Sequence, residues 1–160
     1  MGSLDGRIAL ITGSSRGIGE HLAKHLAKAG AKVAIAARTV EVTDKRLPGT
    51  IHSVSESINS EGGTATPVVM NMRDPESIIN GVSQAVEELG GLDIVINNAA
   101  ILVPGNLETV QDRHLDLIWQ IDLRGPLLLM KYALPHLKNA GRGDIINISS
   151  VAGRVVFPSG

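Results

Sequence analysis

A short apolar run followed by three closely spaced glycines constrains the fold of this chain more than any other feature. Residues 8–12 read Ile-Ala-Leu-Ile-Thr, which is typical of a buried strand, and the glycines follow at positions 13, 17 and 19. Residues 18–29 continue with an amphipathic pattern that places these apolar side chains on one helix face: Ile18, Leu22, Leu26 and Ala29. A strand, a glycine turn and a helix in this order are the context that a dinucleotide phosphate site requires.

Each part of this segment has a physical reason to bind phosphate. Glycine lets the backbone turn sharply and approach a pyrophosphate closely. A helix that begins near Arg16 offers unpaired N–H groups and the positive end of its dipole. The alternative is a strand-to-helix turn whose glycines serve packing alone. We predict that the following residues contact the cofactor: Gly13, Ser14, Ser15, Arg16, Gly17, Ile18 and Gly19.

The composition narrows the class of protein. The chain has 160 residues, a formal net charge of −1 and no cysteine. We expect one domain over residues 1–160, without disulfides, thiolate catalysis or a cysteine metal site. The near-zero charge and scarce aromatic residues argue against nucleic acid as a partner. No apolar stretch is long enough to span a membrane and the N-terminus has no signal region, so we expect a cytoplasmic protein with no membrane association.

Strand-like and helix-like segments alternate along the chain, which predicts a doubly wound parallel α/β sheet of the Rossmann type. Strands are expected after the first at 32–37, 64–70, 92–96 and 144–149, and helices at 51–60 and from Asp74 to Leu89. A long helical region should begin at a capping box formed by Thr109 and Asp112, and break near Gly125 and Pro126. His21 and His25 share a helix face, but a third ligand is not evident and we predict no metal site.

Three motifs occur in the order and spacing of one family. They are Thr12-Gly13-xxx-Gly17-Ile18-Gly19, Asn97-Asn98-Ala99-Ala100 and Asn147-Ile148-Ser149-Ser150. Together they resemble the short-chain dehydrogenase/reductase family, and residues 38–51 resemble its hydroxysteroid dehydrogenase-like branch.

The resemblance implies a fold, a reaction and a set of contacts. Members transfer hydride between a nicotinamide cofactor and a small alcohol or carbonyl substrate. Asn97, Asn98 and Ala99 would pack against the first strand and line the adenosine side of the cleft, or else cap buried backbone groups at the strand end, and Ala100 is expected to bind the cofactor beside them. Asn71 stands where many members carry an Asp that contacts adenine. The helix around Leu127–Met130 would meet a neighbouring subunit, so a homo-oligomer or an exposed apolar patch is expected.

The choice between NADP(H) and NAD(H) can be argued from charge. A fold that prefers NAD places Asp or Glu at the end of the second strand to hold the ribose 2′-hydroxyl. Here that position is Ala37, Arg38 follows it, and Arg16 lies inside the glycine turn. Because two guanidinium groups can clamp a 2′-phosphate, we predict NADP(H), with NAD(H) as the less favoured cofactor. The alternative is two solvated surface arginines.

The catalytic set implied by the resemblance is incomplete. Ser150 falls at the family's Ser, and Asp122 falls where the family has an Asn that completes a proton relay. The family's general-acid Tyr and the Lys four residues after it are absent, and we expect them just past Gly160. Tyr132 is no substitute, because His136 stands four residues later.

The sequence therefore predicts the N-terminal portion of a longer enzyme, with a sheet that is incomplete on its C-terminal side. A non-catalytic dinucleotide-binding module, or an inactive fragment, is the alternative function. A third possibility is an α/β interaction domain without a ligand.

Overall fold

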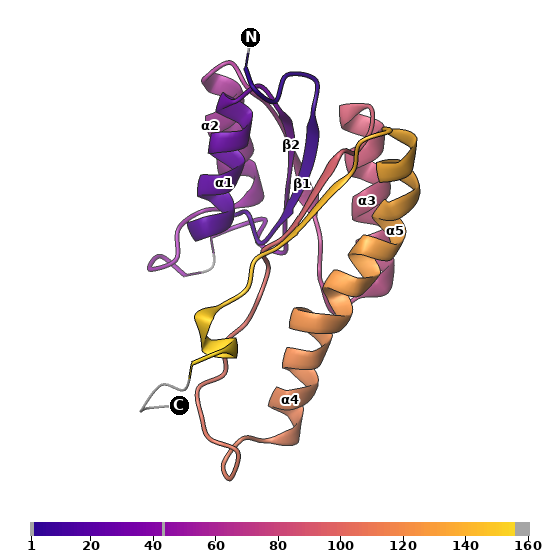
Figure 1. Ribbon diagram of the computed structural model, residues 1–160. Helices are drawn as coiled ribbons and strands as arrows, with labels where there is room; N and C mark the ends of the chain where they lie inside the picture. The colour runs from indigo at the N-terminus through magenta and orange to yellow at the C-terminus, as the bar shows by residue number, and fades with distance from the viewer. Residues whose placement is uncertain (1, 43, 156–160) are drawn as a thin grey trace.

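The computed structural model describes residues 2–42 and 44–155 and contains one parallel sheet (Figure 1). Its strands lie in the order β3-β2-β1-β4-β5. Their bounds are β1 Ile8–Thr12, β2 Lys32–Ala37, β3 Thr64–Val69, β4 Ile94–Asn97 and β5 Asp144–Asn147. The helices are α1 Gly17–Lys28, α2 Ile51–Ser60, α3 Pro75–Leu89, α4 Asp112–Ile118 and α5 Gly125–Asn139, with a π-helical turn η1 at Trp119–Arg124 and a 3₁₀ turn η2 at Val151–Gly153. The predicted doubly wound α/β fold is confirmed.

Two helix layers cover opposite faces of the sheet. Leu10 of β1 faces a cluster built with α3 and α5, while its neighbour Ile11 faces a second cluster built with α1 and α2. Both side chains are fully buried, because successive residues of a strand point to opposite faces. Figure 1 shows α1 and α2 on one side of the strands and α3 and α5 on the other. Apolar burial on both faces explains why β1 reads as a continuous apolar run.

Most predicted elements are present, with small shifts at their ends. The second strand and the helix at 51–60 have the predicted bounds, and α3 begins after Asp74, whose side chain accepts a hydrogen bond from the Glu76 N–H. The fourth strand begins later than predicted, at Ile94, and the fifth ends earlier, at Asn147.

The long helical region differs from the prediction in two ways. Gln111 is the N-cap of α4, and Thr109 instead donates its hydroxyl to Asn106 Oδ1 at 2.8 Å, so the predicted capping box is wrong. The predicted break at Gly125 is also wrong, because η1 leads directly into α5. Pro126, the second residue of α5, has no backbone N–H to donate to the preceding turn, and it directly follows the wider π-helical turn η1. A π-helical turn with one residue more per turn takes the place of the break.

The buried face of α1 is not the predicted one at its first turn. Ile18 is 66% exposed, whereas Gly19 and Ala23 are buried. A Cβ on Gly19 would lie 2.5 Å from the Gly13 carbonyl oxygen, so the helix approaches the preceding turn closely through its glycine. That close approach turns Ile18 outward, and the apolar face predicted through Ile18 is wrong there.

The last strand is far more exposed than the others. Asp144–Asn147 are all exposed, with Ile145 at 39% and Ile146 at 44%, although these two residues point to opposite faces. β5 lies at the end of the sheet and pairs with β4 alone in the described part of the chain. This bare edge agrees with a sheet that is incomplete on its C-terminal side.

Candidate functional site

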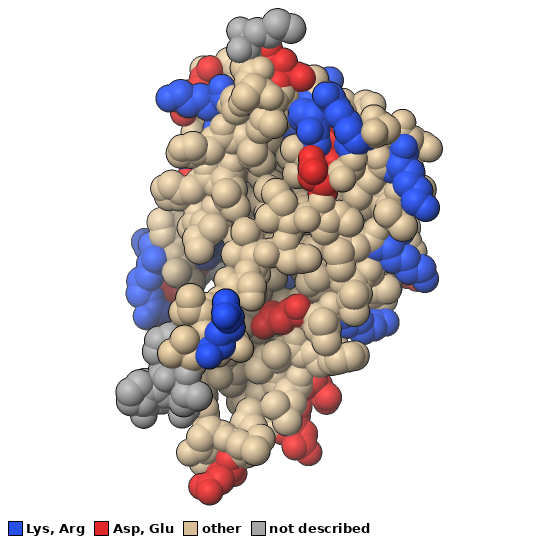
Figure 2. All heavy atoms as spheres, in the orientation of Figure 1, with Lys and Arg blue, Asp and Glu red and all other residues tan. Residues whose placement is uncertain are grey.

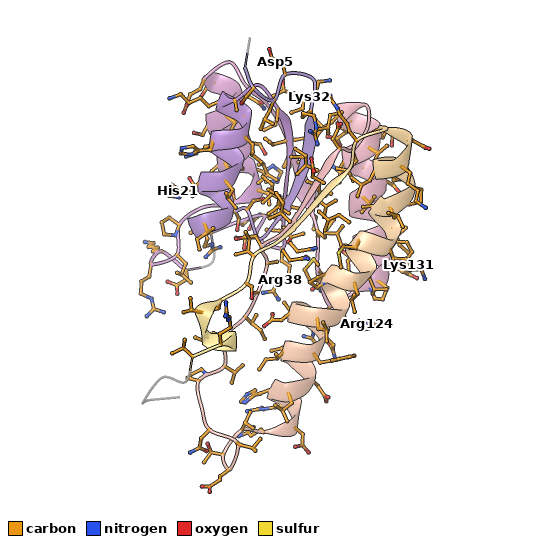
Figure 3. The ribbon with its side chains drawn as sticks, viewed as in Figure 1. Asp5, His21, Lys32, Arg38, Arg124 and Lys131 are labelled. Carbon is orange, nitrogen blue, oxygen red and sulfur yellow. The ribbon has the colours of Figure 1, made fainter. Side chains whose placement is uncertain are left out.

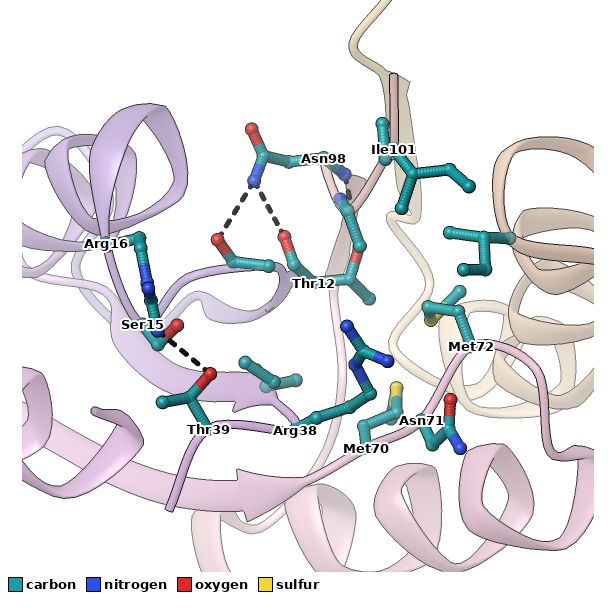
Figure 4. A pocket seen from close by; sticks show the side chains of 16 residues that line it. Thr12, Ser15, Arg16, Arg38, Thr39, Met70, Asn71, Met72, Asn98 and Ile101 are labelled. Atoms are coloured by element: carbon teal, nitrogen blue, oxygen red, sulfur yellow. Dashed lines mark hydrogen bonds between the residues drawn. The ribbon is translucent and has the colours of Figure 1, made fainter. Parts of the chain in front are cut away.

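A cavity of about 330 Å³ lies where β1, β2, β3 and β4 end (Figure 4). In parallel sheets with this order, ligands bind at the carboxyl ends of the strands, beside the point where the strand order reverses. Figure 3 shows Arg38, just after β2, at this end of the sheet, and Lys32, the first residue of the same strand, at the opposite end. Of the predicted cofactor-binding residues, the following line the cavity: Gly13, Ser15, Arg16, Arg38, Asn71, Asn98, Ala99 and Ala100.

The glycine turn needs glycine for two separate reasons. Gly13 has φ +67° and Gly17 has φ +59°, a region that other residues rarely adopt. At Gly13 a Cβ would also lie 2.9 Å from Ala99 Cα, so the first turn residue packs directly on the segment after β4. Gly17 has open space around its missing side chain. The turn thus presents bare backbone to the cavity at Gly13, as a phosphate cradle requires.

Thr12 joins this turn to the end of β4. Its Oγ1 accepts hydrogen bonds from the backbone nitrogens of Asn98 (3.1 Å) and Ala99 (3.0 Å). Asn98 returns the contact, because its Nδ2 donates to the Thr12 carbonyl oxygen at 2.8 Å (Figure 4). The Asn98 side-chain amide therefore stabilises the turn, and the same residue lines the cavity.

The remaining predicted cofactor residues, Ser14, Gly17, Ile18 and Gly19, do not belong to the cavity lining. Ser14 is buried between β1 and β2, where its Oγ donates to the Ile11 carbonyl (2.7 Å) and accepts from the Ala36 N–H (3.0 Å). Its side chain holds the turn against the sheet. Any contact of this residue with a cofactor would therefore come from its backbone.

The cavity is lined by two cations. Arg38 is exposed and points into the cavity between Thr12 and Asn71 (Figure 4). Arg16 is partly buried and directs its Nη2 to Thr39 Oγ1 at 3.0 Å. Ala37, at the end of β2, is buried and carries no charge. The electrostatic character of this end of the cavity is therefore positive.

Asn71 closes the far side of the cavity. Its Oδ1 accepts from the Arg73 N–H at 3.2 Å, and its own N–H donates to Ser77 Oγ at 2.9 Å. The side-chain oxygen is thus engaged in a local turn, which leaves the amide Nδ2 as the group that can donate to a ligand.

Asp122 and Ser150 each accept a hydrogen bond from the backbone through a side-chain oxygen. Asp122 lies in η1, and its Oδ1 accepts from the Ile101 N–H at 3.0 Å. Ile101 and Ile121 line the cavity, so Asp122 stands directly behind the cavity wall. Ser150 is exposed and its Oγ accepts from the Ala152 N–H at 3.1 Å, at the start of η2. It is outside the lining.

Sequence reasoning missed several residues of the cavity wall. Met70 and Met72 flank Asn71 just after β3, and Thr39 follows Arg38 after β2. The methionines could have been found, since the carboxyl ends of neighbouring parallel strands meet at one edge. Nothing in the sequence around Thr39 indicated that it would bind Arg16.

Within 2–42 and 44–155, no helix has the length and apolar character needed to cross a membrane. In the same ranges, no group of three or more His, Cys, Asp or Glu side chains is arranged to hold a metal ion. The face shown in Figure 2 carries both basic and acidic side chains, separated by broad uncharged areas.

The sequence is similar to those of known proteins. A sequence profile of the short chain dehydrogenase family matches residues 7–160. The chain belongs to the short-chain dehydrogenase family. Among curated proteins, hydroxysteroid dehydrogenase-like protein 2 of Bos taurus is 43% identical over 149 residues, which cover 92% of this chain and 35% of that protein. The Danio rerio protein of the same name is 44% identical with the same coverage. The predicted resemblance to the hydroxysteroid dehydrogenase-like branch is thereby confirmed.

Solved short-chain dehydrogenase structures share the fold. One from Mycobacterium thermoresistibile superposes with a TM-score of 0.86 at 37% identity, covering 92% of this chain and 52% of that one. A metagenomic short-chain oxidoreductase in complex with NADP gives a TM-score of 0.86 at 33% identity, covering 99% and 68%. Of the curated relatives named above, this short-chain dehydrogenase chain spans about a third of the length.

Proposed function

We propose that this protein is an NADP(H)-dependent oxidoreductase that interconverts an alcohol and a carbonyl compound by hydride transfer. The charge of the cavity supports NADP(H) over NAD(H). Arg16 and Arg38 line it, and the residue at the end of β2 is the uncharged Ala37. An acidic side chain there would hold the ribose hydroxyls of NAD and repel a 2′-phosphate. Guanidinium groups instead bind phosphate oxygens through charge-assisted hydrogen bonds. The NADP complex of a solved relative supports the same choice.

The residues present fit such a cofactor. Bare backbone at Gly13, with Ala99 packed directly behind it, suits the pyrophosphate, and the two arginines suit the 2′-phosphate. Asn71, Asn98, Ala99 and Ala100 would surround the adenosine. The nicotinamide, when bound, supplies or accepts the hydride.

The proton chemistry is assigned to side chains of the protein. The Ser150 hydroxyl accepts from Ala152 N–H, which leaves its own hydrogen to donate to the reacting oxygen of the substrate. We assign the relay position to Asp122, whose Oδ1 accepts from the Ile101 N–H behind the cavity wall. We assign the general acid to a Tyr, assisted by a Lys four residues on, in sequence that follows Gly160.

A titration with NADPH and NADH tests the cofactor choice. We expect NADPH to bind at least about tenfold more tightly, equivalent to about 1.4 kcal/mol. Ala37→Asp should reverse this order, because the new carboxylate opposes the 2′-phosphate. Arg124→Ala is the matched control, since Arg124 is exposed and lies outside the cavity lining. Tighter binding of NADH by the unaltered protein would overturn the proposal.

Activity requires a separate test. Reading the gene beyond Gly160 should reveal Tyr-xxx-Lys within a few codons, and Ser150→Ala in the enzyme should lower kcat about 100-fold by removing one donor to the reacting oxygen. A stop codon or unrelated sequence there would instead favour the second candidate.

The second candidate is a dinucleotide-binding module without catalysis. The observation in its favour is Asp122, because an ionised carboxylate cannot donate a hydrogen bond as the family's Asn can. Its Oδ1 is moreover engaged by the Ile101 N–H. NADPH binding without any carbonyl reduction, in a chain that contains the Tyr and Lys, would identify this function.

We further propose a cytoplasmic homo-oligomer that uses α5 and the turn before it. Leu123, Leu127 and Leu134 are 47%, 51% and 42% exposed, an apolar surface that a second copy of the chain would cover. Light scattering after size exclusion should give a mass of two or more chains. Leu127→Glu should shift that mass toward the monomer, whereas Lys28→Glu, on an exposed position of α1 on the opposite side of the sheet (Figure 1), should not.

A further inference from the structure

The Arg16 side chain joins the glycine turn to the loop between β2 and α2. Its Nη2 donates to Thr39 Oγ1 at 3.0 Å and to the Gly49 carbonyl oxygen at 3.4 Å. Figure 4 shows the Arg16–Thr39 contact at the edge of the cavity. Arg38, by contrast, has no hydrogen-bond partner among the described residues. The two arginines of the cavity therefore differ, because Arg16 donates hydrogen bonds to the described part of the chain and Arg38 makes none there.

Thr39 is itself fixed by the start of α2. Its carbonyl oxygen accepts from the Ile51 N–H at 3.0 Å. Thr50, the N-cap of α2, forms a reciprocal capping box with Ser53, which anchors this end of the helix. The hydroxyl of Thr39 is therefore presented to Arg16 from a backbone that α2 holds in place.

Gly49 brings the other end of the same loop onto the turn. It has φ +108°, and a Cβ there would lie 2.4 Å from the Ser15 carbonyl oxygen. Only a glycine allows this approach, so the loop backbone packs against the residue that precedes Arg16. The two acceptors of Arg16 thus come from opposite ends of one loop.

The donors of Arg16 divide into two sets. A guanidinium carries five N–H groups in a fixed plane, and both contacts use Nη2. The hydrogens of Nε and Nη1 have no acceptor among the described residues. An arginine that is oriented in advance loses less rotamer freedom when it binds a phosphate, which increases affinity.

We propose that Thr39 and Gly49 are positioning residues that orient Arg16 for the 2′-phosphate and so contribute to the discrimination between NADP(H) and NAD(H). This inference rests on the proposed NADP(H) preference. It makes the β2–α2 loop a specificity element that acts through Arg16.

Calorimetric titration of the purified protein with 2′,5′-ADP and 5′-AMP tests the inference without catalysis, because the probes differ only in the 2′-phosphate. Thr39→Val keeps the side-chain shape and removes the acceptor. We expect it to weaken 2′,5′-ADP about fivefold to tenfold and 5′-AMP less than about twofold. Thr39→Ser, which keeps the hydroxyl, should restore the wild-type ratio. Gly49→Ala is a second variant that should act in the same direction by pushing the loop off the turn.

The outcomes separate the two proposals. Equal weakening of both probes by Thr39→Val, or no change in either, overturns the positioning role. If Arg16→Ala loses the preference for 2′,5′-ADP while Thr39→Val keeps it, the positioning role fails and the NADP(H) preference stands. If the unaltered protein binds 5′-AMP as tightly as 2′,5′-ADP, the proposed cofactor preference fails and the positioning role fails with it. Thermal unfolding of each variant identifies any that are not folded.

Discussion

The glycine turn is held by hydrogen bonds to other strands, whereas the segment around Ser150 is held by hydrogen bonds within its own turn. Thr12 and Ser14 are buried, and each bonds to backbone on a neighbouring strand or on the segment after it. Ser150 is exposed and, among the described residues, it bonds only to Ala152 and Gly153, two and three residues away. The strand before it, β5, is exposed on both faces, whereas every residue of β1 is buried.

This difference shows which part of the chain is fixed in shape by contacts between distant residues. Contacts between residues more than 80 positions apart hold the turn against the end of β4, so its shape does not depend on a ligand. The orientation of Ser150 depends on a local turn, whereas packing and surrounding hydrogen bonds are what lock the rotamer of a side chain. The following substitutions test this contrast, beginning with the largest expected effect.

Gly13→Ala should damage the turn most. The new Cβ would lie 2.9 Å from Ala99 Cα in a backbone with φ +67°. We expect a loss of about 3 kcal/mol or more in the free energy of unfolding, together with weaker NADPH binding. Gly62→Ala is the control, because it has φ +84° and no atom within 4 Å, so strain alone should cost about 1–2 kcal/mol. Chemical denaturation checks both, and equal losses would show that the Ala99 contact is unimportant.

Thr12→Val should come second. It removes the acceptor of two backbone N–H groups, those of Asn98 and Ala99. Since both residues are partly buried, we expect a loss of about 2 kcal/mol in the free energy of unfolding. Thr12→Ser keeps the hydroxyl and should lose much less. A valine variant as stable as wild type would mean that the end of β4 is held without this side chain.

Asp122→Ala tests the hydrogen bond that joins η1 to the segment after β4. Loss of the acceptor for the Ile101 N–H should destabilise the protein by about 1 kcal/mol and speed hydrogen exchange at Ile101. Asp122→Asn retains an acceptor oxygen and should stay within about 0.5 kcal/mol of wild type. If both variants are equally destabilised, the charge of Asp122, and not its acceptor, supports this segment.

The smallest effect should come from pH at the β2–α2 loop. The Arg46 side chain beside Asp44 lowers the pKa of that carboxyl, its backbone N–H adds to this, and Arg16 contributes a smaller attraction. Because the folded-state pKa lies below the unfolded one, the stabilisation is present above the unfolded value and is lost as the pH falls through the folded value. NMR titration of Asp44 should give the lowered pKa, and Arg46→Gln should return it toward normal. An unchanged Asp44 pKa in that variant would contradict the assignment.

The sequence predicted the strands, most helix ends and the place of the cavity, because these follow from local patterns. Glycines at 13, 17 and 19 after an apolar run require a turn, and parallel strands require their carboxyl ends to share an edge. The π-helical turn around Asp122 was not predicted, because helical periodicity in sequence does not distinguish one inserted residue from a break.

What the sequence by itself determined is the order of strands and helices and the chemical character of the cavity: glycine backbone, two arginines and no acid at position 37. Only the tertiary structure decided which groups those residues contact. Ile18 faces outward because Gly19 packs on Gly13, and Arg16 is held by residues 23 and 33 positions away. Such contacts depend on how separate elements pack in space, and spacing along the chain does not specify them.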